Sequence, residues 1–214
     1  MTPRAALDQG LGELPLTLPV DAREQLLRYV ALLAKWGRTY NLTAIRSPLE
    51  MVSQHLLDSL AVIPYLPLPS RDAVLADVGS GAGLPGIPLA IARPAWRVTL
   101  NDASQKKCAF LRQATIELAL RNVEVQEGRV EAWLPARPFE VVISRAFAEL
   151  ASFVSACGHL VARGGALAAM KGTYPGEELG RLPACCRCDQ AFRLRVPLLD
   201  AERHLVLCRV ESPA

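Results

Sequence analysis

The sequence of 214 residues predicts an α/β protein with a doubly wound, mostly parallel sheet of seven strands and a helical extension before it. From about residue 70 onward, short apolar runs alternate with helical stretches, which is the order of elements in βαβ units. The apolar runs lack strict alternation, as is typical of strands buried on both faces. A glycine-rich segment directly follows the first run and opens a helix, at the position where doubly wound sheets bind their ligands.

The first part of the chain contains two expected amphipathic helices. Asp21 and Glu24 have the spacing of a capping box, and apolar residues then recur at helical intervals as far as Gly37. The second helix begins after Ser47, with proline at its first position and Glu50 as the reciprocal acid. Three prolines then end this pattern: Pro64, Pro67 and Pro69.

We place a boundary near residue 70, between a helical extension of residues 1–70 that faces the substrate and a cofactor-binding domain of residues 71–214. The strands expected in the second part cover residues 73–78, 96–100, 123–126, 140–144, 166–170, 190–196 and 204–210. The helices between them cover residues 84–92, 104–120, 130–134 and 149–161. No comparable helix separates the last two strands, so they predict a hairpin at the edge of the sheet.

Composition limits the class of protein. Hydrophobic residues make up 51% of the chain and charged residues 21%, which fits a globular protein with a sizeable core. The longest apolar run, residues 84–92, contains two prolines and is far shorter than the ~20 residues of a membrane span. The amino terminus has no apolar signal core, so we expect a cytoplasmic enzyme.

The formal net charge of +3 permits nucleic-acid binding without indicating it. Basic side chains of the first third form either a patch for phosphate groups or a solvated helix surface: Arg4, Arg23, Arg28, Lys35, Arg38 and Arg46.

Six cysteines raise the question of a metal site. Cys185 and Cys188 have the spacing of half a zinc site, and His204 and Cys208 are candidates for the other half. These two lie four positions apart in an expected strand, a separation of ~13 Å that is too large for one ion. We therefore expect no metal, and because a reducing cytoplasm keeps thiols reduced, we expect free thiols.

The glycine segment favours S-adenosylmethionine as cofactor. Gly79, Gly81 and Gly83 let the backbone bend sharply and approach a ligand closely. The dinucleotide-binding fingerprint G-x-G-x-x-G also matches the sequence from Gly81 onward, but this match starts two residues after the strand ends. When the fingerprint is placed at Gly79, where it should begin, Leu84 occupies the position of its third glycine. Asp77 places negative charge where a pyrophosphate would lie, whereas a sulfonium cofactor with an ammonium group tolerates it. A nicotinamide-dependent oxidoreductase and a glycine turn without a ligand are the alternatives.

Polar features also follow the other expected strands. Asp102 ends the second strand, where a carboxylate accepts hydrogen bonds from ribose hydroxyls. Residues 128–131 follow the third strand, Arg145 the fourth and Lys171 the fifth. Each alone is explained equally well as a surface charge or an ion pair. Together they indicate a ligand-binding edge of the sheet.

Several short motifs occur in one order along the chain: Tyr40-Asn-Leu-Thr43, His55-Leu-Leu-Asp-Ser59, Asp77-Val-Gly-Ser-Gly-Ala-Gly-Leu-Pro-Gly86, Ser144-Arg-Ala146, Lys171-Gly172 and Glu202-Arg-His-Leu-Val206. This ordered set closely resembles the bacterial 16S ribosomal RNA guanine-(nitrogen-7) methyltransferases, the glucose-inhibited division protein B family. The similarity covers about residues 20–210.

The resemblance implies the Rossmann-like fold of class I methyltransferases, S-adenosylmethionine as cofactor, and methyl transfer to nitrogen-7 of a guanine in 16S rRNA. It also implies cofactor contacts at a set of five positions: Gly79, Leu84, Val130, Glu131 and Arg145. The loop glycines, Asp77 and Asp102 join this set by the arguments above. We expect a monomer whose partner is 16S rRNA or the small ribosomal subunit, with no membrane contact. A methyltransferase of another RNA and a non-catalytic RNA-binding protein are further alternatives.

The implied nucleophile determines which side chains to look for. Guanine nitrogen-7 has an in-plane lone pair and no proton, so no general base is expected, and catalysis rests on positioning and on control of charge. Arg145 and Lys171 are candidates for orienting a phosphate or the guanine carbonyl oxygen, and Asn41 for the base edge. His55 and Asp58 are three positions apart and suited to pair, although a packed structural histidine is an equal alternative.

Overall fold

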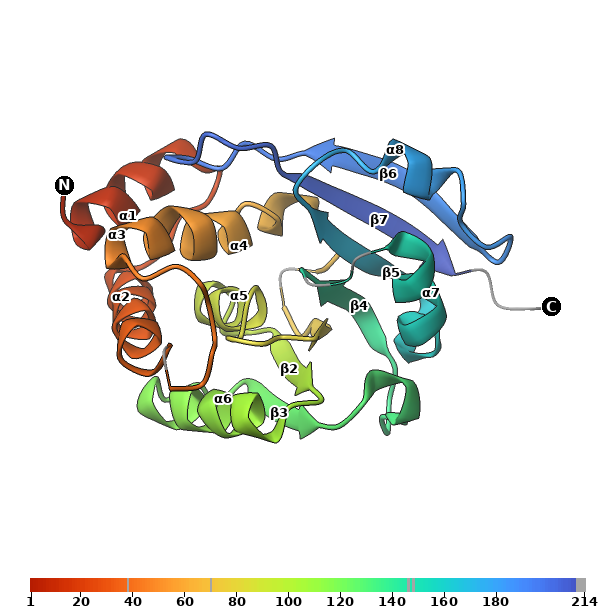
Figure 1. The fold of residues 1–214 in the computed structure, drawn as a ribbon, viewed down its shortest axis with the longest axis horizontal. Coiled ribbons are helices and arrows are strands. Elements are labelled where there is room, and N and C mark those ends of the chain that lie inside the picture. Colours follow the sequence, from red (N-terminus) through yellow and green to blue (C-terminus); the bar gives the residue numbers. More distant parts are fainter. Residues whose placement is uncertain (38, 70, 146, 148, 211–214) are drawn as a thin grey trace.

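The computed structural model describes residues 1–37, 39–69, 71–145, 147 and 149–210. Seven strands form one sheet in the order β3-β2-β1-β4-β5-β7-β6 (Figure 1). The first five strands are parallel, and β7 is antiparallel to both its neighbours, β5 and β6. The strands are β1 (Val74–Val78), β2 (Arg97–Asp102), β3 (Val123–Glu127), β4 (Phe139–Ser144), β5 (Val161–Lys171), β6 (Cys186–Arg193) and β7 (His204–Val210). This confirms the predicted fold class, all seven strands and the hairpin at the edge.

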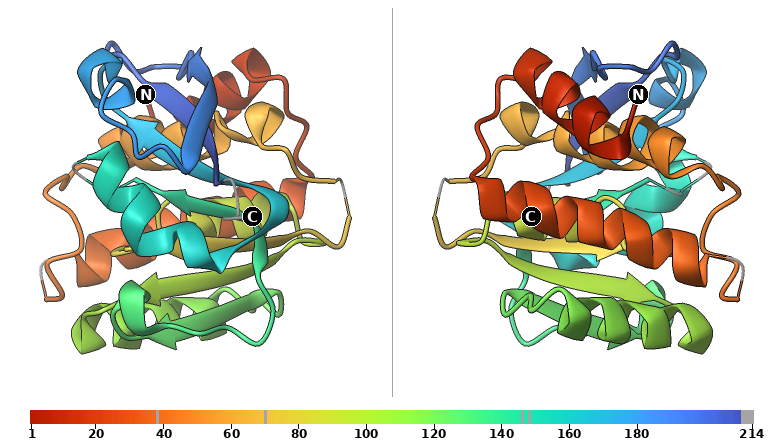
Figure 2. Two further views of the ribbon diagram at one scale, coloured as in Figure 1. Left: turned by 90° about the vertical axis from the view of Figure 1, so that its right-hand side faces the viewer. Right: turned by 90° about the vertical axis from the view of Figure 1, so that its left-hand side faces the viewer.

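Helices cover both faces of the sheet. On one face, α5 (Gly86–Ala92) and α6 (Gln105–Glu117) pack against β2, and α2 (Val20–Trp36) packs outside α5. On the other face, α7 (Leu150–Cys157) packs against β5. Figure 2 shows α2 and α7 on opposite sides of the sheet. Because side chains alternate along each strand, neighbouring residues of the strands contribute to two separate apolar cores.

The amino-terminal helices differ from the sequence prediction at their ends. The helix α1 (Pro3–Glu13), capped by Thr2, was not predicted, because two glycines interrupt its short apolar stripe. The helix α2 begins at Val20, and its N-cap is Pro19 without a side-chain cap, so the predicted capping box at Asp21 is wrong. Glu24 instead pairs with Arg4.

The second predicted helix of the extension is divided. It begins as α3 (Pro48–Met51), with the Ser47 hydroxyl accepting a hydrogen bond from the Glu50 N–H at 3.4 Å, which confirms the predicted N-cap. A π-helical turn (Val52–Leu57) follows, and α4 (Asp58–Leu60) ends it. Such turns are frequent at functional sites.

One core joins the helical extension to the sheet. Leu7, Leu33 and Leu57 from the extension are completely buried in the same apolar core as Leu75 of β1. The boundary near residue 70 therefore stays a prediction about function rather than an observed structural division. Among the described residues, no helix has the length and apolar character that crossing a lipid bilayer requires.

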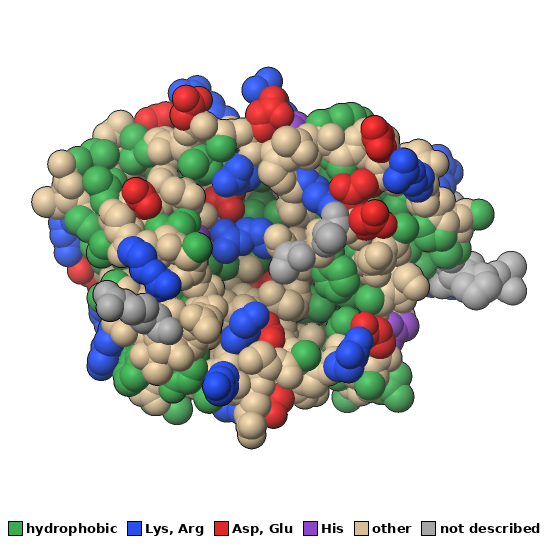
Figure 3. Space-filling model, in the orientation of Figure 1, with side chains coloured by type: hydrophobic (Ala, Val, Ile, Leu, Met, Phe, Trp, Pro, Cys, Tyr) green, Lys and Arg blue, Asp and Glu red, His purple; other side chains and the backbone are tan. Residues whose placement is uncertain are grey.

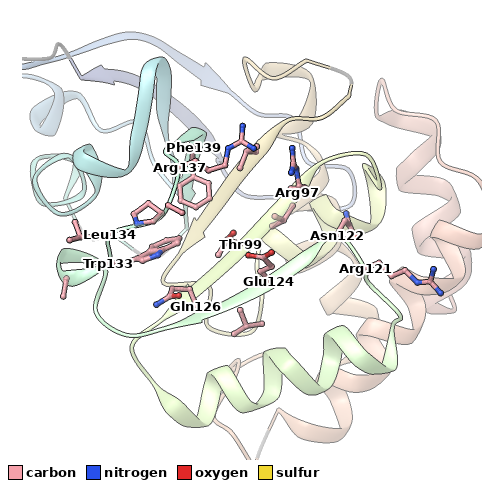
Figure 4. Close-up of a pocket in the computed structure, with 16 residues that line it drawn as sticks. Arg97, Thr99, Arg121, Asn122, Glu124, Gln126, Trp133, Leu134, Arg137 and Phe139 are labelled. Carbon is pink, nitrogen blue, oxygen red and sulfur yellow. The ribbon is translucent and has the colours of Figure 1, made fainter.

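The connection between β3 and β4 contains a shorter helical segment than the sequence predicted. Residues 130–134 form only a 3₁₀ turn, Val130–Ala132. Beside it lies a groove of about 730 Å³ over β2 and β3. Figure 4 shows Arg97 and Arg137 at one end of this groove and Glu124 and Gln126 projecting from its floor. None of the residues that we predicted to bind cofactor or substrate lines it.

The cysteines also depart from the prediction of free thiols. Cys188 and Cys208 form a disulfide between β6 and β7, while Cys108, Cys157 and Cys185 are free. The prediction rested on a reducing compartment, and on spacing along one strand. It missed the pairing of β6 with β7, which places Cys188 directly opposite Cys208. The remaining elements are α8 (Gly176–Leu179) and two further 3₁₀ turns, Ile63–Tyr65 and Gly158–Leu160.

Candidate active site

The glycine loop after β1 has the backbone geometry that its sequence predicts. Gly79, Gly81 and Gly83 have φ values of 67°, 57° and 91°, a region that side chains with a Cβ rarely adopt. A Cβ on Gly83 would also lie only 2.5 Å from Cδ1 of Ile87. The loop is therefore built to keep bare backbone amides at the end of β1.

A cavity of about 330 Å³, which we call the β1–β3 cavity, opens at the ends of the first three strands. It is lined by Val78, Gly79, Asn101, Asp102, Ala103, Gly128, Arg129, Val130, Glu131 and Phe147. Asp102 is the central acid here, because its Oδ2 accepts the Gly81 N–H at 2.9 Å and its Oδ1 accepts the Ser104 N–H at 2.8 Å. The predicted residues Gly79, Asp102, Val130 and Glu131 thus meet in one cavity.

Asp77 does not line this cavity, because its side chain is completely buried below the loop. Its Oδ2 accepts the Gly86 N–H at 2.8 Å, while its Oδ1 is buried and accepts no hydrogen bond from the described residues. Burial raises the pKa of Asp77 to about 7, against the opposing effect of the Gly86 hydrogen bond. The structure shows Asp77 tying the loop to the start of α5, and its predicted contact with the cofactor stays a prediction.

Leu84 lies after the loop, and its side chain is buried in the apolar core. Leu84 does not line the β1–β3 cavity, and its N–H donates to the Ser80 carbonyl at 3.1 Å, so its predicted contact with the cofactor stays a prediction. Glu131 is half exposed and pairs with Arg129 at 3.6 Å, so its carboxylate is available at the rim of the cavity.

A second cavity, of about 360 Å³, lies beyond the ends of β4 and β5, and we call it the β4–β5 cavity. Its lining comes from the π-helical turn, the strand ends and the start of β7: Ile45, Gln54, His55, Asp58, Arg145, Met170, Lys171, Gly172, Leu194, Arg203 and His204. Figure 3 shows Lys and Arg side chains gathered around a hollow in the middle of one face of the molecule.

Asp58 is the buried acid of this cavity, with only 2% of its side chain exposed. Its Oδ2 lies 3.3 Å from Nη1 of Arg145, and its Oδ1 lies 3.0 Å from Nε of Arg203. Arg145 Nη1 also donates to the Gln54 carbonyl at 3.1 Å. Burial raises the pKa of Asp58, and the two guanidinium groups oppose this rise. One carboxylate therefore orients two arginines toward a common space.

The predicted pairing of His55 with Asp58 is wrong. Thr43 Oγ1 lies 2.9 Å from Nε2 of His55, and the Gln54 carbonyl lies 3.0 Å from its Nδ1. Burial and the positive charge of Arg145 lower the pKa of His55 to about 4. His55 is therefore neutral at physiological pH and connects the Thr43 loop to the cavity wall.

Lys171 and His204 lie on opposite strands in register, at the end of β5 and the start of β7. The Lys171 side chain is 10% exposed, and its Nζ lies 2.8 Å from Oε2 of Glu178. His204 is buried, packs edge-on against Tyr174, and has an Nδ1 that forms no hydrogen bond with the described residues. The wall of the cavity thus holds a paired cation beside an imidazole nitrogen with free hydrogen-bonding capacity.

Asn41, which was predicted to contact the substrate, lines neither cavity. It is exposed, in a left-handed turn with φ 50° after α2. Two of the six basic side chains of the first third form ion pairs, Arg4 with Glu24 and Arg23 with Asp8. Arg38 of the same six and Ala146 of the Ser144-Arg-Ala motif lie outside the described residues.

Three residues that line the β4–β5 cavity or pair with its lining were not predicted to act there: Asp58 as an anchor for arginines, Arg203, and Glu178 as the partner of Lys171. The first two belong to the motifs His55–Ser59 and Glu202–Val206, so the motif order contained the signal. Glu178 lies in no such motif, and its role depends on α8 folding back over β5.

Two features together define a class I S-adenosylmethionine-dependent methyltransferase. The first is the strand order, in which β7 lies antiparallel between β5 and β6. The second is an intact glycine loop that faces an acid at the end of β2. A family model described as rRNA small subunit methyltransferase G matches residues 22–206. The chain belongs to this family, which confirms the resemblance seen in the sequence and overturns the alternative of a nicotinamide-dependent oxidoreductase.

Individual proteins agree with this assignment. The chain is 54% identical over 209 residues to the ribosomal RNA small subunit methyltransferase G of Burkholderia thailandensis, covering 96% of this chain and 90% of the relative. A DhpI complex with SAH has a TM-score of 0.59 at 18% identity and covers 89% of this chain and 99% of that one. A SAM-dependent methyltransferase from Aquifex aeolicus has a TM-score of 0.56 at 17% identity, covering 86% and 98%. These two structures support the fold alone.

Proposed function

We propose that the chain transfers a methyl group from S-adenosylmethionine to nitrogen-7 of a guanine in 16S rRNA, with the cofactor in the β1–β3 cavity and the guanine in the β4–β5 cavity. The observation that carries this assignment is the position of the two cavities at the ends of successive strands of one sheet. Phe147 lines the first cavity and Arg145 the second, so a single loop after β4 borders both.

The residues of the β1–β3 cavity fit S-adenosylmethionine. The Asp102 carboxylate suits the ribose hydroxyls, and the apolar side chain of Val130 suits the adenine face. The backbone at Gly79 and Gly81 allows close approach of the methionine part. The bound cofactor supplies an electrophilic methyl group on a sulfonium. We also place Gly83, Leu84 and Glu131 among the cofactor-binding residues, through backbone for the first two.

The β4–β5 cavity fits a base that becomes positively charged. Arg145, Arg203 and Lys171 provide donors for the carbonyl oxygen beside nitrogen-7. Their charge is offset by the carboxylates of Asp58 and Glu178, so the wall carries little excess positive charge. The neutral imidazole of His55 adds none. This balance favours methylation of a neutral base, and no side chain needs to remove a proton.

We infer that the enzyme acts in the cytoplasm as a monomer on 16S rRNA or the small subunit. Residues 1–70 then face the RNA, and Asn41, exposed at the turn after α2, contacts RNA outside the two cavities.

The test is methyl transfer from radiolabelled S-adenosylmethionine to separated rRNAs and to small subunits from a strain that lacks the modification. Label at a guanine nitrogen-7 of 16S rRNA is the expected result, and the preferred form of the substrate identifies the partner. Label in another RNA, or in protein alone, would overturn the substrate assignment.

A pair of variants tests the second cavity. Arg203→Ala removes a guanidinium from the cavity, and Arg181→Ala removes an exposed guanidinium that lines neither cavity. We expect a loss of turnover only for Arg203→Ala, with cofactor affinity unchanged in both. Equal turnover of the two variants would place the guanine elsewhere.

A further inference from the structure

The hairpin of β6 and β7 gathers three sulfur atoms that the methyltransferase chemistry does not use. Cys188 and Cys208 lie directly opposite one another in the two strands, and Cys186 lies two positions before Cys188. The Sγ atoms of Cys186, Cys188 and Cys208 all lie within 4.8 Å of one another. We call these three residues the sulfur cluster.

Strand geometry explains why the three side chains converge. Residues two apart in a strand point to the same face, and cross-strand partners share that face. The register shifts between Cys188 and Gln190, so a bulge follows the cluster and bends the edge strand. Cys186 and Cys208 are buried in the apolar core on the α7 side of the sheet.

We propose that the reduced sulfur cluster is a binding site for a thiophilic d¹⁰ cation, Zn²⁺ or Cu⁺. Thiolates are the ligands that these two ions prefer, and the three Sγ atoms lie within 4.8 Å of one another, close enough for one ion to bind all of them once the Cys188–Cys208 bond is reduced. In the oxidised chain Cys188 and Cys208 share a disulfide and are not available as ligands.

The two states interconvert by balanced chemistry. A phosphine reductant supplies two electrons and takes the oxygen of one water molecule to become the phosphine oxide, and the two hydrogens of that water convert the Cys188–Cys208 disulfide into two thiols. A dithiol reductant achieves the same by exchange, giving up two electrons and two protons and becoming a disulfide itself. Binding of the cation then displaces the thiol protons of Cys186, Cys188 and Cys208, and affinity rises with pH for that reason.

Such an ion would join the edge strand β6 to β7. β7 begins at His204, in the wall of the β4–β5 cavity, and reaches Cys208 four residues later. Either covalent or metal linkage therefore fixes the hairpin that completes that wall. The exposed thiol of Cys185, although next to Cys186 in sequence, does not belong to the cluster.

The test uses the full-length protein, freed of metal and reduced with a phosphine. Native mass spectrometry after addition of Zn²⁺, and separately of Cu⁺, should show one bound equivalent for at least one of the two ions. Protein oxidised beforehand should bind none. Cys186→Ser, Cys188→Ser and Cys208→Ser should each lose the equivalent, whereas Cys185→Ser is the matched control and should retain it.

Alkylation gives a second measurement that does not depend on the variants folding. Bound metal should protect three thiols of the wild-type chain from iodoacetamide while Cys185 still reacts. The proposal is wrong if the reduced wild-type chain binds neither ion, if the oxidised chain binds as well as the reduced one, or if Cys185→Ser abolishes binding.

Discussion

Replacing Asp58 with asparagine tests whether one buried carboxylate organises the β4–β5 cavity. The substitution keeps the shape of the side chain and removes the charge that faces Arg145 and Arg203 at 3.3 and 3.0 Å. Loss of one partner from a buried ion pair typically costs about 3–5 kcal/mol. The two arginine side chains are 28% and 25% exposed, so water compensates part of this loss. We expect the free energy of unfolding to fall by about 2–3 kcal/mol.

The functional effect should exceed the stability effect. Arg145 and Arg203 lose the group that holds both toward the cavity, and a misplacement of this kind lowers turnover by roughly 10- to 100-fold. Cofactor affinity should not change, since Asp58 does not line the β1–β3 cavity. Urea denaturation, equilibrium binding of cofactor and methyl transfer to unmodified small subunits measure the three quantities.

The control is Asp8→Asn, which breaks a largely exposed pair with Arg23 and should cost less than about 1 kcal/mol. The reasoning is refuted if Asp58→Asn matches this control in both stability and turnover. It is also refuted if the variant loses stability while its turnover, measured on the folded fraction, stays at the wild-type level.

Three further predictions concern buried groups and the loop. The pKa of Asp77 is raised from 3.8 to about 7, so the folded state holds the proton more tightly than the unfolded state does. The free energy of unfolding therefore falls by about 4 kcal/mol as pH rises from 3.8 to 7. Asp77→Asn should remove this loss in pH-dependent urea melts. His55 has the opposite effect, because its pKa is lowered from 6.5 to about 4. The free energy of unfolding therefore falls by about 3 kcal/mol as pH falls from 6.5 to 4. His55→Gln should abolish this loss of stability in acid. Equal pH profiles for wild type and both variants would contradict these two assignments. Gly83→Ala should lower the melting temperature and weaken cofactor binding, because φ at this position is 91° and the new Cβ meets Ile87. The expected loss in the free energy of unfolding is about 1–3 kcal/mol. The control is Gly12→Ala in α1, which has open space around it and should be neutral or stabilising.

Local patterns were sufficient to predict the sheet and the loop from the sequence. Apolar runs marked the five parallel strands, because buried parallel strands need them, and apolar segments also marked the antiparallel strands β6 and β7. Gly79, Gly81 and Gly83 marked the turn after β1, where positive φ values favour glycine. The π-helical turn at Val52–Leu57 could not be predicted, since its apolar residues also satisfy an ordinary helical period.

The site was harder to predict than the fold, because its side chains meet across long separations. Asp58 contacts Arg145 and Arg203 at sequence separations of 87 and 145 residues. His55 is closer to Asp58 in the chain, yet its ring turns to Thr43 instead. Likewise, the contact of Cys188 with Cys208 depends on a strand register that contains a bulge. Such contacts follow from the packed fold and not from spacing along one element.

The antiparallel insertion of β7 between β5 and β6 has a consequence for synthesis of the enzyme. A nascent chain that ends before residue 204 already contains every residue that lines the β1–β3 cavity, but it lacks His204 and the strand that pairs with Lys171. Chains emerge amino terminus first, so under the proposed assignment the capacity to hold cofactor precedes the capacity to hold a guanine. Translation itself thus delays competence toward RNA until the last strand is in place.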